Sequence, residues 1–344
     1  MNINHYNPTA GVDVIIPYYN HSAVISRALS SIAMQTIAKD IHVVIVDDAS
    51  ASTDINKLQK IIEGFNATGI ASIKVVSVPE NMGPGHARAV GQQSCSHEFI
   101  TFMDADDTWA NAYSIEWLVD AFTQHRQLDA VFGGFLEETG NPQAMFVEHK
   151  QDCTWMFGKM YRRAFLDSNN ILMNSSRSNE DMGFNQLVLA CTDNVGFMEQ
   201  AVYFWMKNDE SITRKKNNDY QFTGLLGYIW NHEWAEKERQ KRHINTTEKG
   251  QIAAVDALIM CYFYYMEVLQ DRPKDQAEKC LEAVQSFFNT AYREGQVPET
   301  ILTQRFSAMN LAHSQPGGLL TRVIPKMSIY GFVGILKNGG EQVV

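Results

Sequence analysis

The sequence predicts an α/β protein with a doubly wound, mostly parallel sheet, followed by an α-helical C-terminal region. Two observations carry this prediction. Up to about residue 215, short β-branched runs alternate with amphipathic helical patterns, which is typical of strand–helix–strand units. From about residue 220 onward only helical patterns occur. We therefore expect an N-terminal lead-in over residues 1–11, an α/β domain over residues 12–218 and a helical domain over residues 219–344.

The expected strands are runs rich in Val, Ile and Phe that end in proline, glycine or polar residues. They cover residues 12–17, 41–46, 73–78, 98–103, 130–135 and 195–206. Helical patterns of the α/β part cover residues 22–35, 53–65, 84–94 and 113–125, and a further helix opens at Glu180. The C-terminal patterns cover residues 220–241, 246–270, 274–294 and 299–311. Strands and helices that alternate at this spacing favour parallel strand pairing.

Composition points to a cytoplasmic globular protein. The five cysteines are odd in number and show no CxxC spacing, so reduced thiols are expected. No apolar stretch reaches the roughly 18 residues of a transmembrane segment. Residues 323–336 are apolar and aromatic, and we interpret them as a packed C-terminal element, with peripheral docking on a membrane as the alternative. The formal net charge of -10 argues against a nucleic-acid partner, while Arg162, Arg163 and two short basic runs keep that partner open.

Three carboxylates follow the expected strand at residues 98–103. Asp104, Asp106 and Asp107 stand where this buried strand emerges, and open α/β sheets bind ligands at such strand ends. A hard divalent cation that holds a diphosphate suits the position, because Mg²⁺ takes one or two carboxylates and completes its shell with water and phosphate oxygens. The alternative is a solvated acidic turn that caps the next helix.

Polar loops follow the other expected strands as well. Tyr19 and Asn20 follow the first strand, Asp48 follows the second, and residues 81–88 follow the third. The fold would gather these loops at one edge of the sheet. The glycine-rich turn from Gly83 permits close approach of a ligand and opens a helix whose free N–H groups favour an anion, although neither a phosphate loop nor a dinucleotide motif is present.

Two later segments carry further candidate residues. Glu180 and Asp181 open a helix, where either catalysis or the favourable helix dipole explains them. Residues 155–166 interleave aromatic and basic side chains, which suits an acceptor site that includes Trp155 and Arg162, but an amphipathic strand-to-helix corner explains the pattern equally well.

Five motifs taken together resemble the family 2 glycosyltransferases of GT-A fold. They occur in the order expected for that family, at residues 14–20, 46–54, 81–88, 102–107 and 179–181. The resemblance covers about residues 12–215 and does not extend to the C-terminal third. It implies inverting transfer of a sugar from a nucleoside diphosphate, usually UDP, to an acceptor hydroxyl.

The resemblance also implies roles for single residues. The nucleotide-binding set would be Pro17, Tyr19, Asn20, Asp48, Asn81, Arg88, Asp104, Lys207 and Ser211. Pro17 and Tyr19 would flank the base, and Asp48 would accept a hydrogen bond from the uracil. Lys207 and Ser211 would close over the diphosphate, where relatives often have arginine, which binds in a bidentate manner that lysine lacks. Ala49 departs from a commoner glycine.

The metal and the base complete the implied site. The metal would be Mn²⁺ or Mg²⁺, with Asp106 as a direct ligand, Asp104 at the ribose or the metal's waters, and Asp107 in support. Asp181 would be the general base and Glu180 its neighbour.

Alternatives remain open for the activity and for the acceptor. The chain could bind nucleotide sugars without catalysis, or hydrolyse glycosides with two carboxylates. A glycan, lipid-linked sugar, wall polymer, protein or modified base would each offer a hydroxyl. We expect the C-terminal helices to bind the acceptor or to mediate oligomerisation.

Overall fold

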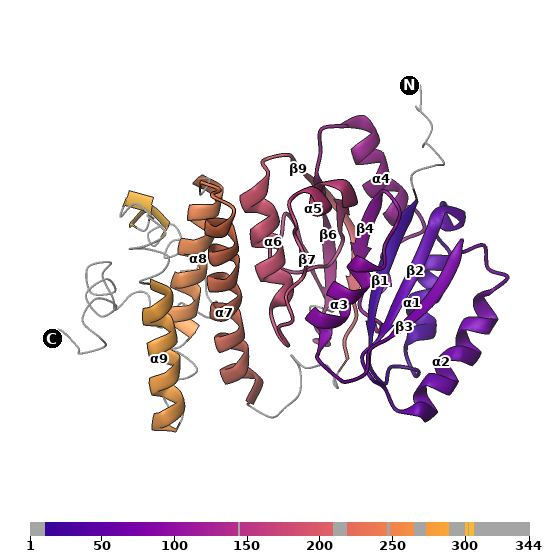
Figure 1. The fold of residues 1–344 in the computed structure, drawn as a ribbon, viewed down its shortest axis with the longest axis horizontal. Helices are drawn as coiled ribbons and strands as arrows, with labels where there is room; N and C mark the ends of the chain where they lie inside the picture. Colours follow the sequence, from indigo (N-terminus) through magenta and orange to yellow (C-terminus); the bar gives the residue numbers. More distant parts are fainter. Residues whose placement is uncertain are drawn as a thin grey trace. The chain divides into compact units, whose positions relative to one another are not determined.

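The computed structural model describes residues 11–143, 145–208, 219–245, 248–264, 273–288, 300–301 and 303–305. The chain divides into two compact units. The first comprises residues 1–188 and 192–214, and the second comprises residues 189–191 and 215–344. Figure 1 shows a sheet with helices in the first unit and helices in the second.

The first unit is built on one sheet with the strand order β3-β2-β1-β4-β8-β6-β9-β5, in which β7 pairs with β6. The strands are β1 Val12–Tyr18, β2 Ile41–Asp47, β3 Ser72–Ser77, β4 Phe99–Phe102, β5 Thr108–Trp109, β6 Ala130–Glu138, β7 Phe146–His149, β8 Lys159–Arg162 and β9 Val195–Trp205. The helices are α1 Ile25–Ala33, α2 Ser52–Phe65, α3 Pro84–Gln93, α4 Ser114–Gln124, α5 Arg163–Ser168 and α6 Glu180–Cys191, with a 3-10 turn at Ala38–Asp40.

Parallel pairing organises the half of the sheet that carries the expected loops. Strands β3, β2, β1 and β4 pair in parallel, so their C-terminal ends meet at one edge. The register sets Tyr18 beside Asp47 and Ile15 beside Phe102. Strand β8 joins β4 to β6 through antiparallel pairs, and β6 is parallel to β9. The segments after β1, β2 and β4 therefore lie close together.

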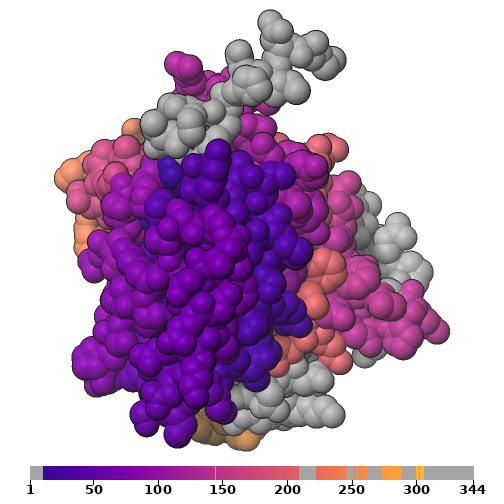
Figure 2. All heavy atoms as spheres, turned by 90° about the vertical axis from the view of Figure 1, so that its right-hand side faces the viewer, coloured from indigo at the N-terminus to yellow at the C-terminus, as the bar shows by residue number. Residues whose placement is uncertain are grey.

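The core explains why these residues form strands. Almost every side chain of β1 and β2 is buried, as their continuous β-branched runs predict for central strands. Strand β3 lies at the edge, and none of its residues is buried. Helix α2 and the neighbouring N-terminal elements form the face coloured indigo to violet in Figure 2.

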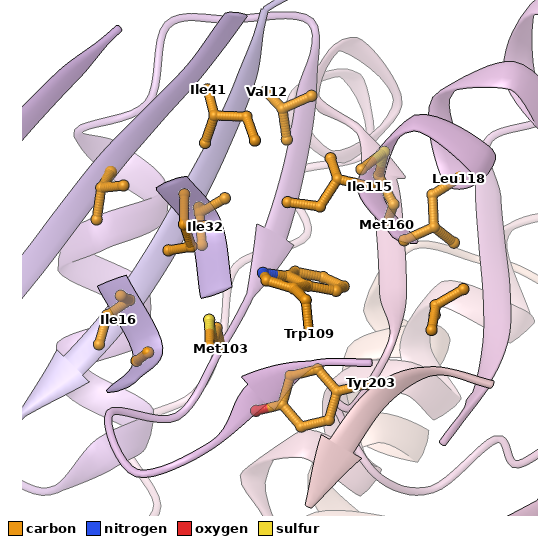
Figure 3. Packing of buried hydrophobic residues seen from close by; sticks show 14 of the residues in the cluster. Val12, Ile16, Ile32, Ile41, Met103, Trp109, Ile115, Leu118, Met160 and Tyr203 are labelled. Atoms are coloured by element: carbon orange, nitrogen blue, oxygen red, sulfur yellow. The ribbon is translucent and has the colours of Figure 1, made fainter. Parts of the chain in front are cut away.

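Aromatic packing fixes the strands that flank the acidic segment. The rings of Trp109 and Tyr203 meet edge to face with centroids 5.6 Å apart, and Met103 lies beside them in the buried cluster (Figure 3). On the opposite side of β4, Phe102 packs edge to face on Phe184 of α6 at 5.8 Å. The helix that begins with Glu180 is thus anchored on the strand that leads into the acidic segment.

The second unit is helical in its described residues. Its helices are α7 Asp219–Lys241, α8 Glu248–Tyr264 and α9 Lys274–Phe288. His232 of α7 packs on Phe287 of α9 with ring centroids 4.9 Å apart. No helix within the described ranges is long and apolar enough to cross a membrane. Residues 323–336, for which membrane docking was the alternative interpretation, lie outside the described residues.

The predicted fold class is confirmed, and most expected elements begin and end within about three residues of the observed ones. Three strands were not among the expected ones. Strand β5 has only two residues, and no element was expected where β7 lies. Strand β8 with helix α5 forms the strand-to-helix corner that was the alternative interpretation of residues 155–166.

Candidate active site

The acidic segment lies between β4 and β5. Asp107 is buried and accepts hydrogen bonds from the Tyr203 hydroxyl at 2.8 Å and from the Met206 backbone N–H at 2.8 Å. Burial raises the pKa of the Asp107 carboxyl well above its usual range, and the charges of Asp104 and Asp106 raise it further. Asp107 therefore ties the acidic segment to the C-terminal end of β9.

Asp104 and Asp106 are more exposed and can take a ligand. The Asp104 side chain is 32% exposed and accepts a hydrogen bond from Arg88 on Oδ1. Asp106 accepts from the Asn208 side chain on Oδ2 at 2.7 Å, and its backbone carbonyl accepts from Arg27. Among the described residues, no hydrogen bond reaches Oδ2 of Asp104 or Oδ1 of Asp106.

This donor set fits a divalent cation that shares its shell with a phosphate ligand. Within the described part of the chain, no group of three or more His, Cys, Asp or Glu side chains is arranged to hold a metal. Mg²⁺ commonly takes only one or two protein carboxylates and relies on phosphate and water for the rest. Two half-exposed aspartates at a strand end meet that requirement.

Asp48 organises the turn that precedes α3. Its carboxylate accepts from the backbone N–H of Met82 at 2.9 Å and of Gly83 at 2.8 Å, and it is buried. Asn81 donates from Nδ2 to the Asp48 carbonyl at 3.2 Å. Gly83 has φ +95, a conformation that L side chains rarely adopt. Asp48 thus positions residues 81–83, and both of its oxygens already accept a hydrogen bond.

The end of β1 is tied to the loop after β2. Asn20 adopts a left-handed conformation, accepts from the Ala51 N–H at 2.9 Å and donates its own N–H to the Ser50 hydroxyl at 2.9 Å. Tyr19 is 46% exposed beside it, and Pro17 is half-buried in β1. Ala49 has φ 59, which gives a physical reason why glycine would be preferred there.

A buried arginine joins the acidic segment to the start of α6. The Arg88 guanidinium donates from Nη2 to Asp104 at 2.5 Å and from Nη1 to Glu180. Its Nε is buried without a hydrogen-bond partner among the described residues. Burial alone would lower the pKa of Arg88, but the charges of Asp104, Glu180 and Asp181 outweigh that effect and raise it.

Asp181 is the second residue of α6, and the pKa of its carboxyl is raised. Burial raises the pKa of Asp181 to about 7, with the neighbouring Glu180 charge contributing in the same direction and Arg88 opposing it. Its Oδ1 accepts a hydrogen bond from the Met182 N–H at 2.8 Å. A base whose pKa lies near neutral pH is well matched to proton abstraction.

The segment before α6 contributes a residue that the sequence analysis missed. Arg177 donates from Nη1 to Oδ1 of Asn81 at 2.9 Å and from Nη2 to the Asn81 carbonyl at 2.6 Å. Its Cγ lies 2.9 Å from the position that a Cβ on Gly83 would occupy. An arginine four residues before Asp181 was the available signal, but nothing in the sequence indicates its distant partner.

The other predicted site residues differ in their surroundings. Trp155 packs on Trp205 with ring centroids 5.2 Å apart, and its carbonyl accepts from Asn185, one turn after Asp181 on α6. Lys207 donates its backbone N–H to Glu138 at 2.8 Å. Ser211 lies outside the described residues.

Arg162 lies away from the acidic segment. It pairs with Phe99 at the N-terminal end of β4, its side chain pairs with Glu98 at 2.5 Å, and it donates to the Leu128 carbonyl. The acidic segment emerges at the other end of β4. This placement argues against the predicted acceptor role of Arg162, which instead ties strand ends together.

Residues 13–178 match the model of Glycosyl transferase family 2. The match covers just under half of the chain and lies within the α/β unit. It is 27% identical over 211 residues to the poly(ribitol-phosphate) beta-N-acetylglucosaminyltransferase TarS of Staphylococcus aureus strain Mu50, which covers 57% of this chain and 35% of that protein. It is 26% identical to the minor teichoic acid biosynthesis protein GgaA of Bacillus subtilis, over 62% of this chain and 51% of that protein. The chain thus spans about a third to a half of these two relatives.

Solved structures of glycosyltransferases share the fold. The crystal structure of S. aureus TarS 1–349 in complex with UDP-GlcNAc superimposes with a TM-score of 0.67 at 20% identity, covering 96% of this chain and 92% of that one. The mannosyltransferase PcManGT of Pyrobaculum calidifontis, in complex with GDP-Man and Mn²⁺, gives 0.54 at 14% identity over 98% and 90% of the two chains. The predicted GT-A fold is confirmed by this likeness.

Proposed function

We propose that the chain transfers a sugar from a nucleoside-diphosphate sugar to an acceptor hydroxyl. The observation that carries the proposal is the convergence of Asp104, Asp106 and Asp181 at one sheet edge, with Arg88 hydrogen-bonded between Asp104 and Glu180. The match of residues 13–178 to the model of Glycosyl transferase family 2 supports glycosyl transfer. The TarS structure, which holds UDP-GlcNAc, supports a uridine nucleotide as the donor.

Asp106 and Asp104 would hold Mn²⁺ or Mg²⁺ against the donor diphosphate. A bound divalent cation supplies Lewis-acid stabilisation of the charge that develops on the leaving phosphate. Asp107 keeps the loop in place through Tyr203 and Met206. The mannosyltransferase structure that contains Mn²⁺ is consistent with this assignment.

Asp181 would accept the proton of the acceptor hydroxyl as that oxygen attacks the sugar. Such general-base catalysis contributes about 100-fold to 10,000-fold to a rate. Attack from the face opposite the leaving nucleotide inverts the anomeric centre, so an inverting reaction is proposed. The name of TarS refers to a ribitol-phosphate polymer, which supports a wall polymer among the acceptors considered.

The experiment measures nucleoside-diphosphate release from a panel of sugar nucleotides with Mn²⁺ or Mg²⁺, with and without candidate acceptors. We expect release from one donor, abolished by EDTA and by Asp106→Ala. Asp181→Asn should reduce transfer by at least about 100-fold while donor binding persists. Undiminished turnover in both variants would contradict the proposal, and nucleotide binding without any turnover would favour the catalytically inactive alternative.

A further inference from the structure

The segment that precedes the base lies directly against the turn that carries the predicted nucleotide site. A Cβ on Gly85 would lie 2.6 Å from the Ser176 carbonyl oxygen and 3.2 Å from Cβ of Glu180. A Cβ on Gly83 would lie 3.4 Å from the backbone Cα of Arg177. Residues 174–180 therefore pack closely against Gly83 and Gly85, where an added Cβ would be crowded.

Arg177 adds a directional connection to this packing. Its guanidinium reaches both the side-chain and the main-chain oxygen of Asn81, at 2.9 and 2.6 Å. A planar fork can make two such bonds at once, whereas a lysine ammonium would act as a single point charge. Asn81 in turn donates to the carbonyl of Asp48, whose carboxylate accepts from Met82 and Gly83. The connection therefore runs from the end of β2 to the segment that carries the base.

We propose that Arg177 is a positioning residue that couples the nucleotide turn, residues 81–83, to the base helix α6. This inference rests on the proposed function. Arg177 acts through Asn81 rather than on the donor, because both of its Nη atoms are directed at Asn81. With the connection intact, a nucleotide that orders the turn also orders residues 177–181, so donor binding places Asp181 for attack.

The coupling has consequences for both binding and turnover. Without Arg177 the turn is less ordered before binding, and a nucleotide must order it at the expense of affinity. The same loss leaves the start of α6 less tightly placed when the donor is bound, which slows the chemical step. Arg177→Ala should therefore weaken nucleotide affinity and lower kcat together, each by about tenfold, which corresponds to roughly 1.4 kcal/mol.

The experiment uses the full chain, with UDP titrated by calorimetry in Mn²⁺ and with UDP release from UDP-GlcNAc measured in parallel. The variants are Arg177→Ala, Arg177→Lys, Asn81→Ala and the double variant of Asn81→Ala with Arg177→Ala. Arg126→Ala is the matched control, because Arg126 is also an exposed arginine but precedes β6 in a remote turn. Thermal melting checks that each variant folds.

We expect Arg177→Lys to remain impaired, because one ammonium cannot replace the fork, and Arg126→Ala to behave as wild type. The double variant should lose less UDP affinity than the product of the two single losses, because both changes break one connection. Wild-type affinity and kcat in Arg177→Ala would overturn the coupling. Full recovery in Arg177→Lys would also overturn it, since Arg177 would then act as a charge on the diphosphate. Failure of wild-type protein to bind UDP or release it would instead contradict the proposed uridine donor, and the inference with it.

Discussion

Arg88 and Glu180 form a buried ion pair that joins α3 to the first residue of α6. Arg88 is 5% exposed and Glu180 is also 5% exposed, and the same guanidinium holds Asp104 through its second Nη. The pair brings one cation between a predicted metal ligand and the neighbour of the predicted base. Because this ion pair is buried, losing one of its charges should affect both the stability of the fold and the chemistry of the site.

Replacing Arg88 should destabilise the first unit. Arg88→Met would leave Glu180 and Asp104 close together without a cation, and breaking a buried pair in this way costs about 3–5 kcal/mol. Urea denaturation followed by tryptophan fluorescence measures the free energy of unfolding. The control Arg126→Met replaces an exposed arginine and should change that energy by no more than about 0.5 kcal/mol. A loss below about 1 kcal/mol in Arg88→Met would show that the pair contributes little.

Activity should depend on the protonation of Asp181. Because burial and the Glu180 charge raise the pKa of Asp181 to about 7, the carboxyl is protonated and inactive below that pH, and kcat/KM should rise with pH through about 7. Glu180→Gln removes the neighbouring negative charge while keeping the shape of the side chain. The pKa of Asp181 should then fall, and the rise in kcat/KM should move to lower pH.

The control for this pH profile is Glu98→Gln. Glu98 pairs with Arg162 at the opposite end of β4, so its charge is remote from Asp181. Its profile should match that of wild type. An identical profile in Glu180→Gln and wild type would mean that Asp181 does not limit the rate on the acidic side.

The hydroxyl of Tyr203 should matter for the acidic segment. It donates to Asp107 at 2.8 Å and accepts from the Asp104 backbone N–H at 3.0 Å, so Tyr203→Phe removes the partner of a buried carboxylate oxygen and of a partly buried N–H. We expect a loss of about 1–3 kcal/mol in the free energy of unfolding. We also expect Mn²⁺ to stimulate UDP release less than it does in the wild-type protein. Tyr113→Phe is the control, because Tyr113 is 50% exposed. Equal stability of the two variants would contradict the supporting role of Tyr203.

Much of the fold and part of the site follow from local sequence. Continuous β-branched runs predict the central strands, because side chains buried on both faces must be apolar. The acidic segment follows β4 directly, so its place at the sheet edge was predictable from the parallel topology. Strand β5 was not predictable, since two residues carry no period and its partner β9 lies far along the chain, where Trp109 pairs with Tyr203.

Long-range partners account for the rest. Arg177 contacts Asn81 across 96 positions of sequence, and no local pattern encodes that meeting. Arg162 stands in a basic and aromatic segment, but β8 runs antiparallel to β4, which places this residue at the end away from the acids. The basic and aromatic character of this segment is visible in the sequence, but the direction in which its strand runs is not.

Close packing between Gly85 and the segment before α6 gives a last prediction. A Cβ at Gly85 would collide with the carbonyl oxygens of Asn174 and Ser176, which are backbone atoms and cannot rotate away. Gly85→Ala should therefore displace the start of α6, lower the free energy of unfolding by about 1–3 kcal/mol and reduce UDP release. Gly64→Ala is the matched control, because Gly64 lies in α2 with no atom within 4 Å of its added Cβ. Because Gly64 is the penultimate residue of α2, that change should stabilise by at most about 0.5–1 kcal/mol with unchanged activity, as measured by urea denaturation and the release assay. Normal activity and stability in Gly85→Ala would mean that residues 174–180 can move away from the turn without consequence for the site.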